Sequence, residues 1–191
     1  MNNGFFAMLF RMKHIKRWGI MHSLIADHLS THSLEVGFIA HALCTIGNET
    51  MGKDYDSSQV TLKAIYHDVP EIFTGDIPTP VKYYSEETKQ AYSAVEVASL
   101  NKLTEMLPDE FRETYSGLFT YTDEERTLIK AADRISAYIK CLEEKNYGNR
   151  EFDIAGERLL DAIKEMQCPE ADYFLDNFLE PFGFPIDSIL Q

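Results

Sequence analysis

The sequence predicts an all-α fold, because two patterns agree. No segment sustains the period-two alternation of a half-buried strand, and no Asn-Gly type of turn joins two apolar runs. Apolar residues instead recur three and four positions apart, which places them on one face of a helix. The chain of 191 residues is 45% hydrophobic, enough for one core of ordinary size. We therefore expect a single domain over residues 1–191, with helices packed around a common centre.

Two helices are expected before residue 47. The first covers about residues 3–13. The second starts with Ser30 or Thr31 as its N-cap, and Glu35 supports the capping pattern. Its apolar stripe continues to about residue 46.

A third helix is expected to start near Ser57 or Ser58. Pro70 should disturb or end it, because proline has no backbone N–H to donate. Residues 74–80 then form a turn-rich segment, in which two prolines should forbid a regular element.

The second half of the chain carries clear helix signals. Ser85, followed by two glutamates, caps a long helix to about residue 106, and Pro108 opens a short one to about residue 119. Thr122 precedes three acidic residues and begins a helix over residues 123–145. Two more helices are expected, over about residues 150–166 and 169–179.

Charge and cysteine content narrow the class of partner. The net charge of −13 disfavours nucleic acid polymers and anionic membranes, which attract basic surfaces. A small phosphorylated substrate stays compatible, since a bound divalent cation can reverse the local field. The short apolar start is followed by basic residues, the reverse of a signal peptide, and three widely spaced cysteines indicate no disulfide framework. We expect a cytoplasmic protein with no membrane segment.

Polar residues on three separate helices are expected to point inward. His32 falls on the apolar stripe of its helix, and His67 and Asp68 lie at the C-terminal end of the next. Asp133 flanks the stripe of the helix over 123–145, where a carboxylate is costly unless it is paired or bound to a metal. Two imidazoles and two carboxylates suit a first-row divalent ion, and the lack of a thiolate argues against a closed structural zinc site.

The order His32…His67-Asp68…Asp133 resembles the H…HD…D pattern of HD-domain phosphohydrolases. The stretch YHDVPEIFTGDIPTPVKY, from Tyr66 to Tyr83, is similar to the YHDxxE…TGDxPTPVKY segment of bacterial HD-domain 5′-deoxynucleotidases. Further similar motifs are the pair Arg17-Trp18, the KAAD of residues 130–133, the YIKCLEE of 138–144 and the DYF of 172–174.

This resemblance implies an HD-domain helical bundle that hydrolyses deoxyribonucleoside 5′-monophosphates. It also implies dependence on a divalent transition metal such as Co or Mn, and a homodimer. No histidine follows His67, whereas two-metal members of the superfamily add histidines before the last aspartate. We therefore expect a mononuclear site.

The resemblance also implies roles for two acidic residues. Glu71 would orient or deprotonate the attacking water, and Asp76 would act beside it, in handling the proton of the leaving 5′-oxygen. The assignment of acid and base between the two stays open.

Asp76 is also implied to bind the substrate, together with four further residues. Arg17 and Lys82 would hold the phosphate, through a guanidinium fork and an ammonium charge. Trp18 would stack on the sugar or help to exclude a 2′-hydroxyl, and Thr79 would donate a hydrogen bond to the phosphate.

Two departures from the family pattern stand beside these residues. Thr31 precedes the first ligand histidine where family members often have Glu, and Pro70 replaces a small residue before Glu71.

Two alternative functions also remain open. One is an HD-fold hydrolase of nucleoside triphosphates or guanosine polyphosphates, and the other is a non-catalytic nucleotide-binding HD protein.

Overall fold

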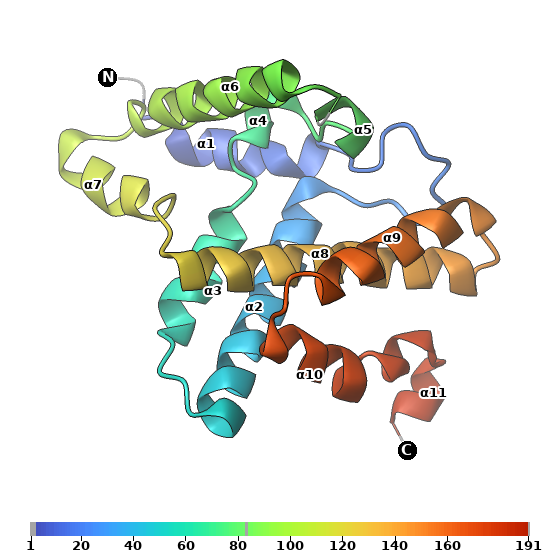
Figure 1. Cartoon of the computed structure of the whole chain (residues 1–191). Coiled ribbons are helices and arrows are strands. Elements are labelled where there is room, and N and C mark those ends of the chain that lie inside the picture. The colour runs from blue at the N-terminus through green and yellow to red at the C-terminus, as the bar shows by residue number, and fades with distance from the viewer. Residues whose placement is uncertain (1–2, 83, 191) are drawn as a thin grey trace. The chain divides into compact units, whose positions relative to one another are not determined.

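The computed structural model describes residues 3–82 and 84–190, and these residues are helical with turns between (Figure 1). In these two ranges there is no strand, only an isolated antiparallel bridge between Lys16 and His28. The all-α prediction is confirmed. No helix in this part of the chain has both the length and the apolar character needed to cross a membrane.

The longer helices follow one another along the chain with short helical turns between them. Their bounds are α1 Phe5–Leu9, η1 Phe10–His14, α2 Leu29–Met51, α3 Ser57–Tyr66, α4 Glu71–Thr74, α5 Thr79–Lys82, α6 Glu86–Thr104, α7 Asp109–Gly117, α8 Asp123–Asn146, η2 Arg150–Phe152, α9 Asp153–Lys164, α10 Pro169–Phe178, η3 Glu180–Gly183 and α11 Ile186–Ile189.

The chain divides into two compact units. The first unit consists of the residues up to His22, Ala26–Ser33 and Tyr66–Thr120, and the second holds the rest. In the first unit, α6 contacts α1, α4, α5 and α7 (Figure 1). Its buried core is formed by Phe5, Met12, Leu29, Val69, Leu103 and Leu107. This unit contains the start of α2 and the turn after α3, which carry the predicted histidines.

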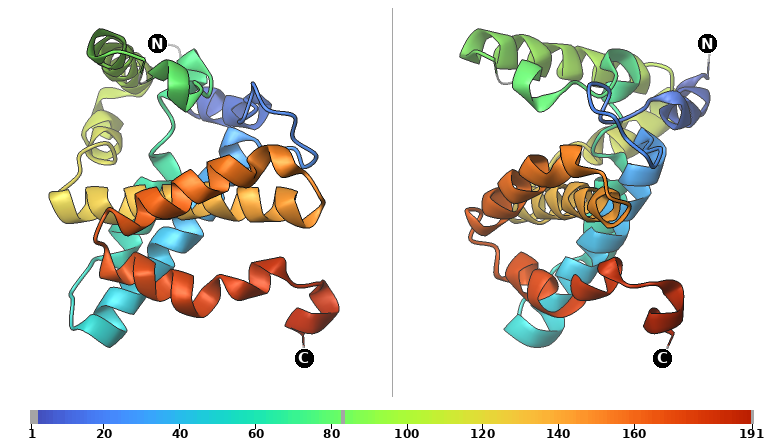
Figure 2. Two further views of the ribbon diagram at one scale, coloured as in Figure 1. Left: turned by 45° about the vertical axis from the view of Figure 1, so that its right-hand side comes forward. Right: turned by 90° about the vertical axis from the view of Figure 1, so that its right-hand side faces the viewer.

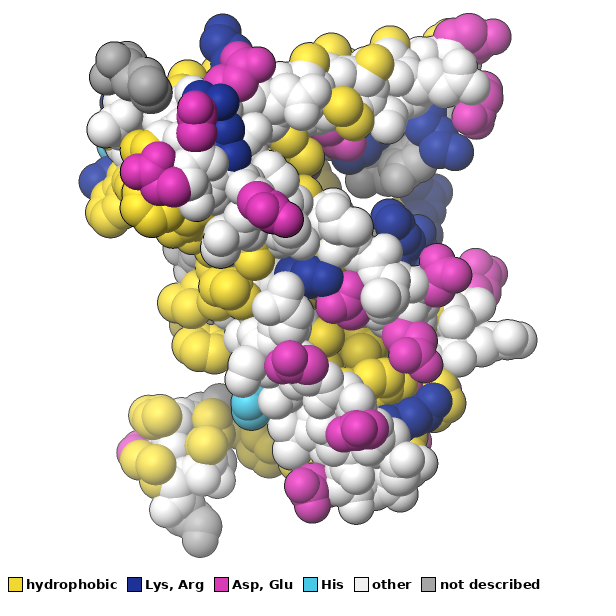
Figure 3. Space-filling view, turned by 90° about the vertical axis from the view of Figure 1, so that its left-hand side faces the viewer, with side chains coloured by type: hydrophobic (Ala, Val, Ile, Leu, Met, Phe, Trp, Pro, Cys, Tyr) yellow, Lys and Arg dark blue, Asp and Glu magenta, His cyan; other side chains and the backbone are white. Residues whose placement is uncertain are grey.

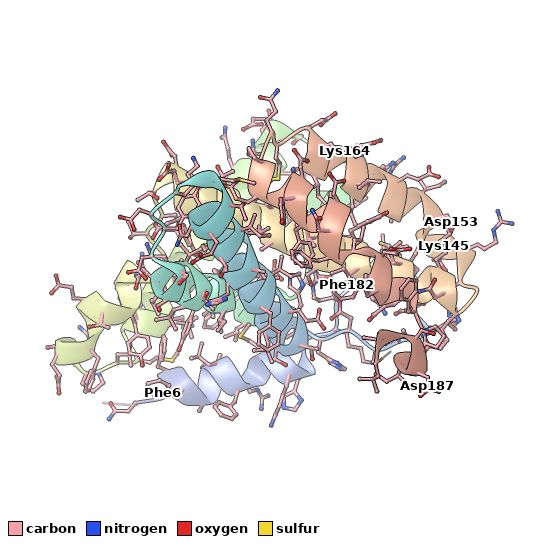
Figure 4. The ribbon with its side chains drawn as sticks, turned by 90° about the horizontal axis from the view of Figure 1, so that it is seen from below. Phe6, Lys145, Asp153, Lys164, Phe182 and Asp187 are labelled. Atoms are coloured by element: carbon pink, nitrogen blue, oxygen red, sulfur yellow. The ribbon has the colours of Figure 1, made fainter. Side chains whose placement is uncertain are left out.

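In the second unit, α9 lies along α8 in both views of Figure 2. The core gathers the apolar stripes of α2, α3, α8 and α10, with Val36, Leu43, Val60, Ile135 and Phe174 among its buried members. Figure 4 shows Lys145, near the end of α8, close to Asp153 at the start of α9, and both line the same small pocket.

Two predicted helix starts are confirmed in atomic detail. The Ser85 Oγ accepts from the backbone N–H of Thr88 at 3.1 Å at the start of α6. Thr122 and Glu125 form the full capping box of α8, with bonds of 3.1 and 2.8 Å. These signals were readable because the bonded groups are three residues apart.

The predicted N-cap of α2 is wrong by two to three residues. The helix begins at Leu29, and the backbone N–H groups of Thr31 and His32 both donate to the carbonyl of His28 at 3.0 Å. Leu29 itself donates to the carbonyl of Ile15 at 2.9 Å, so a contact distant in sequence sets the start. Glu35 accepts instead from the Ser136 hydroxyl at 3.2 Å.

The expectation of no regular element over residues 74–80 is also wrong at its end. Thr79–Lys82 form the four-residue helix α5, with Pro80 in second position. Proline is tolerated there, since a backbone N–H in the first turn has no partner within the helix. Pro70 acts as predicted: α3 ends at Tyr66 and a new helix starts at Glu71.

Candidate metal centre

The turn after α3 brings a histidine and an aspartate beside a second histidine. His32 lies in the first turn of α2, fully buried as its place on the apolar stripe predicted. His67 and Asp68 follow the last residue of α3 directly, in a turn closed by the bond from the Val69 N–H to the Tyr66 carbonyl. These three side chains come from separate parts of the sequence but the same compact unit.

Both imidazoles face one carboxylate oxygen. The Nε2 atoms of His67 and His32 lie 3.0 and 3.5 Å from Asp68 Oδ2, and one ligand atom from each residue lies within 4.8 Å of the others. Ligands about 2.1 Å from one ion are separated from each other by roughly 3.0–3.4 Å at octahedral to tetrahedral angles. The cluster therefore fits a single divalent cation.

The electrostatics of Asp68 favour a ligand that is already ionised. Burial alone would raise the pKa of this carboxyl, but the charge and hydrogen bond of His67 outweigh it. The charges of His32 and Arg17 act in the same direction, and the pKa lies well below its usual range.

Glu71 reaches the cluster from a new helix. The α3 helix ends at Tyr66, and the Glu71 N–H donates to the Asp68 carbonyl at 3.0 Å as α4 begins. Burial, followed by the charges of Asp68 and Asp76, raises the pKa of Glu71 to about 9, with Lys82 and Arg17 partly opposing it. Its Oε2 is buried with no hydrogen-bond partner among the described residues. A carboxyl of this kind, beside other ionisable groups, is typical of proton-transfer sites.

Asp76 lies against the loop that carries the predicted substrate-binding pair. Its Oδ2 accepts from the backbone N–H of Trp18 at 3.0 Å. The Arg17 guanidinium stacks 5.9 Å from the centroid of the Trp18 ring. Trp18 and Asp76, which lie 58 residues apart in sequence, are thus brought together.

Lys82 and Thr79 share the short helix α5. Lys82 Nζ lies 2.7 Å from Glu96 Oε1 on α6, and both side chains are about a third exposed, at 30% and 31%. Thr79 is exposed at the first position of α5. Tyr83, the last residue of the matched stretch, lies outside the described residues.

The first unit therefore assembles most of the residues singled out in the sequence. It contains Arg17, Trp18, His32, His67, Asp68, Glu71, Asp76, Thr79 and Lys82. Asp133 belongs to the second unit, half-buried on α8 beside the buried Ala132. Of the two departures from the family pattern, Thr31 is exposed and Pro70 is buried.

Two residues at this site escaped the sequence reasoning. Asp27 bonds to Arg17 and Trp18, and Glu96 bonds to Lys82. Each partner lies nine or more residues away, and no local motif marks an aspartate or glutamate that will bond to a side chain across a loop.

Two solved structures that superpose on this chain are named HD-domain phosphohydrolases. An HD-domain phosphohydrolase from Listeria innocua superposes with a TM-score of 0.82 at 24% identity, over 93% of this chain and 87% of that one. The cyanophage S-2L HD phosphohydrolase DatZ, bound to dA and one catalytic Zn²⁺ ion, has a TM-score of 0.67 at 21% identity, over 91% and 95% of the two chains. The fold is that of this class of enzyme.

The match to one family is much closer. A family model described as 5′-deoxynucleotidase YfbR-like covers residues 4–182. The 5′-deoxynucleotidase of Vibrio atlanticus is 43% identical over 188 residues, 97% of each chain. The 5′-deoxynucleotidase YfbR of Escherichia coli K12 is 42% identical over 190 residues, 98% of this chain and 96% of that one. This chain belongs to the YfbR-like 5′-deoxynucleotidase family, as the motifs predicted.

Proposed function

We propose that this protein removes the 5′-phosphate from deoxyribonucleoside 5′-monophosphates, giving a deoxynucleoside and inorganic phosphate. The observation that carries the proposal is the convergence of His32 and His67 on the ionised Asp68, in a chain of this family. The structural neighbour DatZ, bound to dA and a catalytic Zn²⁺, supports a small nucleotide as the ligand of such a site.

One divalent transition metal, Co, Mn or a similar ion, would be held by His32, His67 and Asp68, with Asp133 as the fourth ligand. Asp133 is proposed from the order of the H…HD…D pattern. When bound, such an ion lowers the pKa of a coordinated water and offsets phosphate charge. The water oxygen forms a bond to phosphorus, the P–O5′ bond breaks, and a proton reaches the leaving 5′-oxygen.

Glu71 and Asp76 share the proton transfers. Glu71 orients the attacking water or takes its proton through its buried Oε2. Because its pKa is about 9 in the absence of an ion, taking the proton would require the positive charge of the bound ion to favour the ionised carboxylate. Asp76 acts at the leaving 5′-oxygen. The charge of Asp76 contributes to the raised pKa of Glu71, which supports a joint role for the two carboxyls.

Four further residues hold the substrate. Arg17 and Lys82 bind phosphate oxygens, and Thr79 donates a hydrogen bond to them. The salt bridge to Glu96 keeps the flexible Lys82 side chain near this position. Trp18 lies against the deoxyribose and selects against a 2′-hydroxyl.

We also propose a cytoplasmic homodimer in which residues 1–191 form one HD domain. The family model runs through both compact units without interruption, which supports one domain. The three cysteines are buried thiols, and burial raises the pKa of Cys44 to about 12 and of Cys168 to about 11. Protonated, buried thiols suit a reducing compartment. Sedimentation equilibrium tests the dimer.

Phosphate release from a panel of deoxy- and ribonucleoside 5′-monophosphates tests the activity. It should depend on Mn or Co, stop with a chelator, and be lost in Glu71→Ala. No release from any monophosphate with any metal would contradict the proposal. Pyrophosphate release from triphosphates would favour the polyphosphate alternative, and binding without turnover would favour a non-catalytic protein.

Metal content tests the ligand set separately. Asp133→Ala and His67→Ala should each bind less Mn or Co at equilibrium, while Glu71→Ala should bind as the unchanged protein does. An Asp133→Ala variant that keeps full metal affinity would remove Asp133 from the set.

A further inference from the structure

One buried carboxylate joins the two residues of the Arg17-Trp18 pair. Asp27 Oδ2 accepts from Arg17 Nη1 at 3.0 Å and from Trp18 Nε1 at 3.1 Å. The side chains of Arg17 and Asp27 are only 11% and 8% exposed. A single oxygen thus accepts hydrogen bonds from the guanidinium and from the indole. Asp27 is not among the proposed metal ligands, catalytic residues or substrate-binding residues.

The backbone holds Asp27 opposite the pair. The Arg17 N–H donates to the Asp27 carbonyl at 3.0 Å, next to the bridge between Lys16 and His28. The Leu29 N–H donates to the Ile15 carbonyl at 2.9 Å one step further on. Asp27 therefore lies in a backbone segment that is hydrogen-bonded to the segment of Arg17, which limits how far its carboxylate can move.

Trp18 is held at its other end by a second carboxylate. Its φ is +60°, a left-handed conformation that is costly for a bulky side chain and persists only where neighbours enforce it. The Trp18 N–H donates to Asp76 Oδ2, and its carbonyl accepts from the Met21 N–H at 2.9 Å. Asp76 thus holds the backbone and Asp27 the ring.

We propose that Asp27 is a positioning residue that sets the selectivity of this enzyme for deoxyribose over ribose. The inference rests on the proposed function. A 2′-hydroxyl adds one oxygen atom, and a side chain rejects it only if that side chain cannot move aside. Asp27 restrains the Trp18 ring against such movement and holds the Arg17 guanidinium at a fixed distance from that ring. The groups that bind the phosphate and the sugar therefore keep one arrangement.

Fluorescence tests the positioning without any substrate. Trp18 is the only tryptophan of the chain, so all tryptophan emission reports its ring. In Asp27→Asn, acrylamide should quench this emission more strongly and the anisotropy should fall. Equilibrium metal binding and circular dichroism should stay unchanged. Unchanged quenching and anisotropy would overturn the proposal.

Kinetics test the selectivity. Loss of a charge-assisted bond should lower the ratio of kcat/KM between deoxy- and ribonucleotides by about tenfold in Asp27→Asn. The change should come mainly from KM, because Asp27 does not touch the reacting atoms. Asp27→Glu, which keeps a carboxylate, should restore part of the ratio. A ratio equal to that of the unchanged protein would overturn the proposal.

Two further variants keep the test clear. Asp109→Asn is the matched control: it also removes an aspartate paired with an arginine, Arg112 at 2.7 Å, but its side chain is 77% exposed. It should behave as the unchanged protein. If Asp27→Asn fails to fold, replacing Trp18 by its benzothienyl analogue, in which sulfur stands in place of the Nε1–H group, removes that donor and keeps the size of the ring. This replacement should lower the selectivity in the same way, and retained selectivity would overturn the proposal. If no nucleotide is hydrolysed at all, the proposed function fails, while the fluorescence result still decides whether Asp27 holds Trp18.

Discussion

Gly75 directs the chain from α4 toward Asp76 with a backbone that other residues rarely adopt. Its φ of 72° and ψ of 171° lie in a region that is essentially restricted to glycine. Its N–H donates to the Glu71 carbonyl at 2.8 Å, so this one residue closes α4 and starts the segment that carries Asp76. The distance between the two proposed proton-transfer groups therefore depends on a residue without a side chain.

Gly75→Ala should destabilise the protein by about 1–3 kcal/mol and lower kcat. The cause is backbone strain and not lack of space. Apart from the two neighbouring residues, no atom of the described residues lies within 4 Å of an added Cβ. Chemical denaturation and steady-state kinetics measure the two effects. Gly117→Ala is the control, since that position has the same open space and no positive φ. A Gly75→Ala protein as stable and active as the control variant would show that the strain is relieved elsewhere.

At the scale of the helices and loops, basic side chains lie beside individual acidic side chains. On the face drawn in Figure 3, acidic side chains are scattered among Lys and Arg, and no continuous basic surface forms among the described residues there. The basic groups that matter are instead individual residues such as Arg17 and Lys82, each placed beside a carboxylate.

The C-terminal end of α8 anchors a loop through one buried glutamate. Glu144 is fully buried and accepts from the Ser23 hydroxyl at 2.7 Å and from the backbone N–H groups of Leu24 and Ile25 at 3.0 and 2.9 Å. Lys140, one turn earlier, bonds both Glu144 and the Ile25 carbonyl. Glu144 and Lys140 therefore provide hydrogen-bond partners for backbone groups of residues 23–25, which lie outside the helices.

Replacing Glu144 with Gln should destabilise the protein by about 3–5 kcal/mol at neutral pH, because Lys140 would keep a buried charge without its partner. Burial raises the pKa of Glu144, but the bonds from Lys140, Ile25, Asn149 and Leu24 outweigh it and hold the pKa far below its usual 4.5. Its stabilisation is thus complete above pH 4.5 and is lost as the pH falls further. Thermal unfolding of both proteins at several pH values measures this. The difference in Tm should narrow in acid, and a constant difference would contradict the assignment.

At the scale of the whole molecule, the proposed ligand Asp133 belongs to the second compact unit, while His32, His67 and Asp68 belong to the first. If the chain works as one domain, the two units should unfold together. Trp18 fluorescence reports the first unit alone, while far-ultraviolet circular dichroism reports all the helices.

The two signals should therefore give the same unfolding midpoint in denaturant, and Mn or Co should raise both midpoints equally by binding the folded state. His67→Ala is the control, in which the added metal should have a much smaller effect. Separate midpoints, with only the fluorescence transition responding to metal, would show that the units unfold independently and that the second unit does not take part in the site.

The sequence by itself determined the helical fold, the order of the helices and the family. These depend on apolar spacing, on caps such as Ser85 and Thr122 whose bonded partners are three residues away, and on motifs read directly from the chain. It also indicated that His32, His67 and Asp68 would meet, because an inward polar residue needs a partner.

The tertiary structure alone decided contacts between residues far apart in sequence. It started α2 at Leu29 through a bond to Ile15, carried Glu71 to the site on a new helix, and placed Asp27 against Arg17 and Trp18. None of these leaves a local pattern, because a hydrogen bond between distant segments depends on where the chain folds back and not on the spacing of residues along it. The sequence therefore named the chemical groups, while the fold determined which carboxylate holds each of them in position.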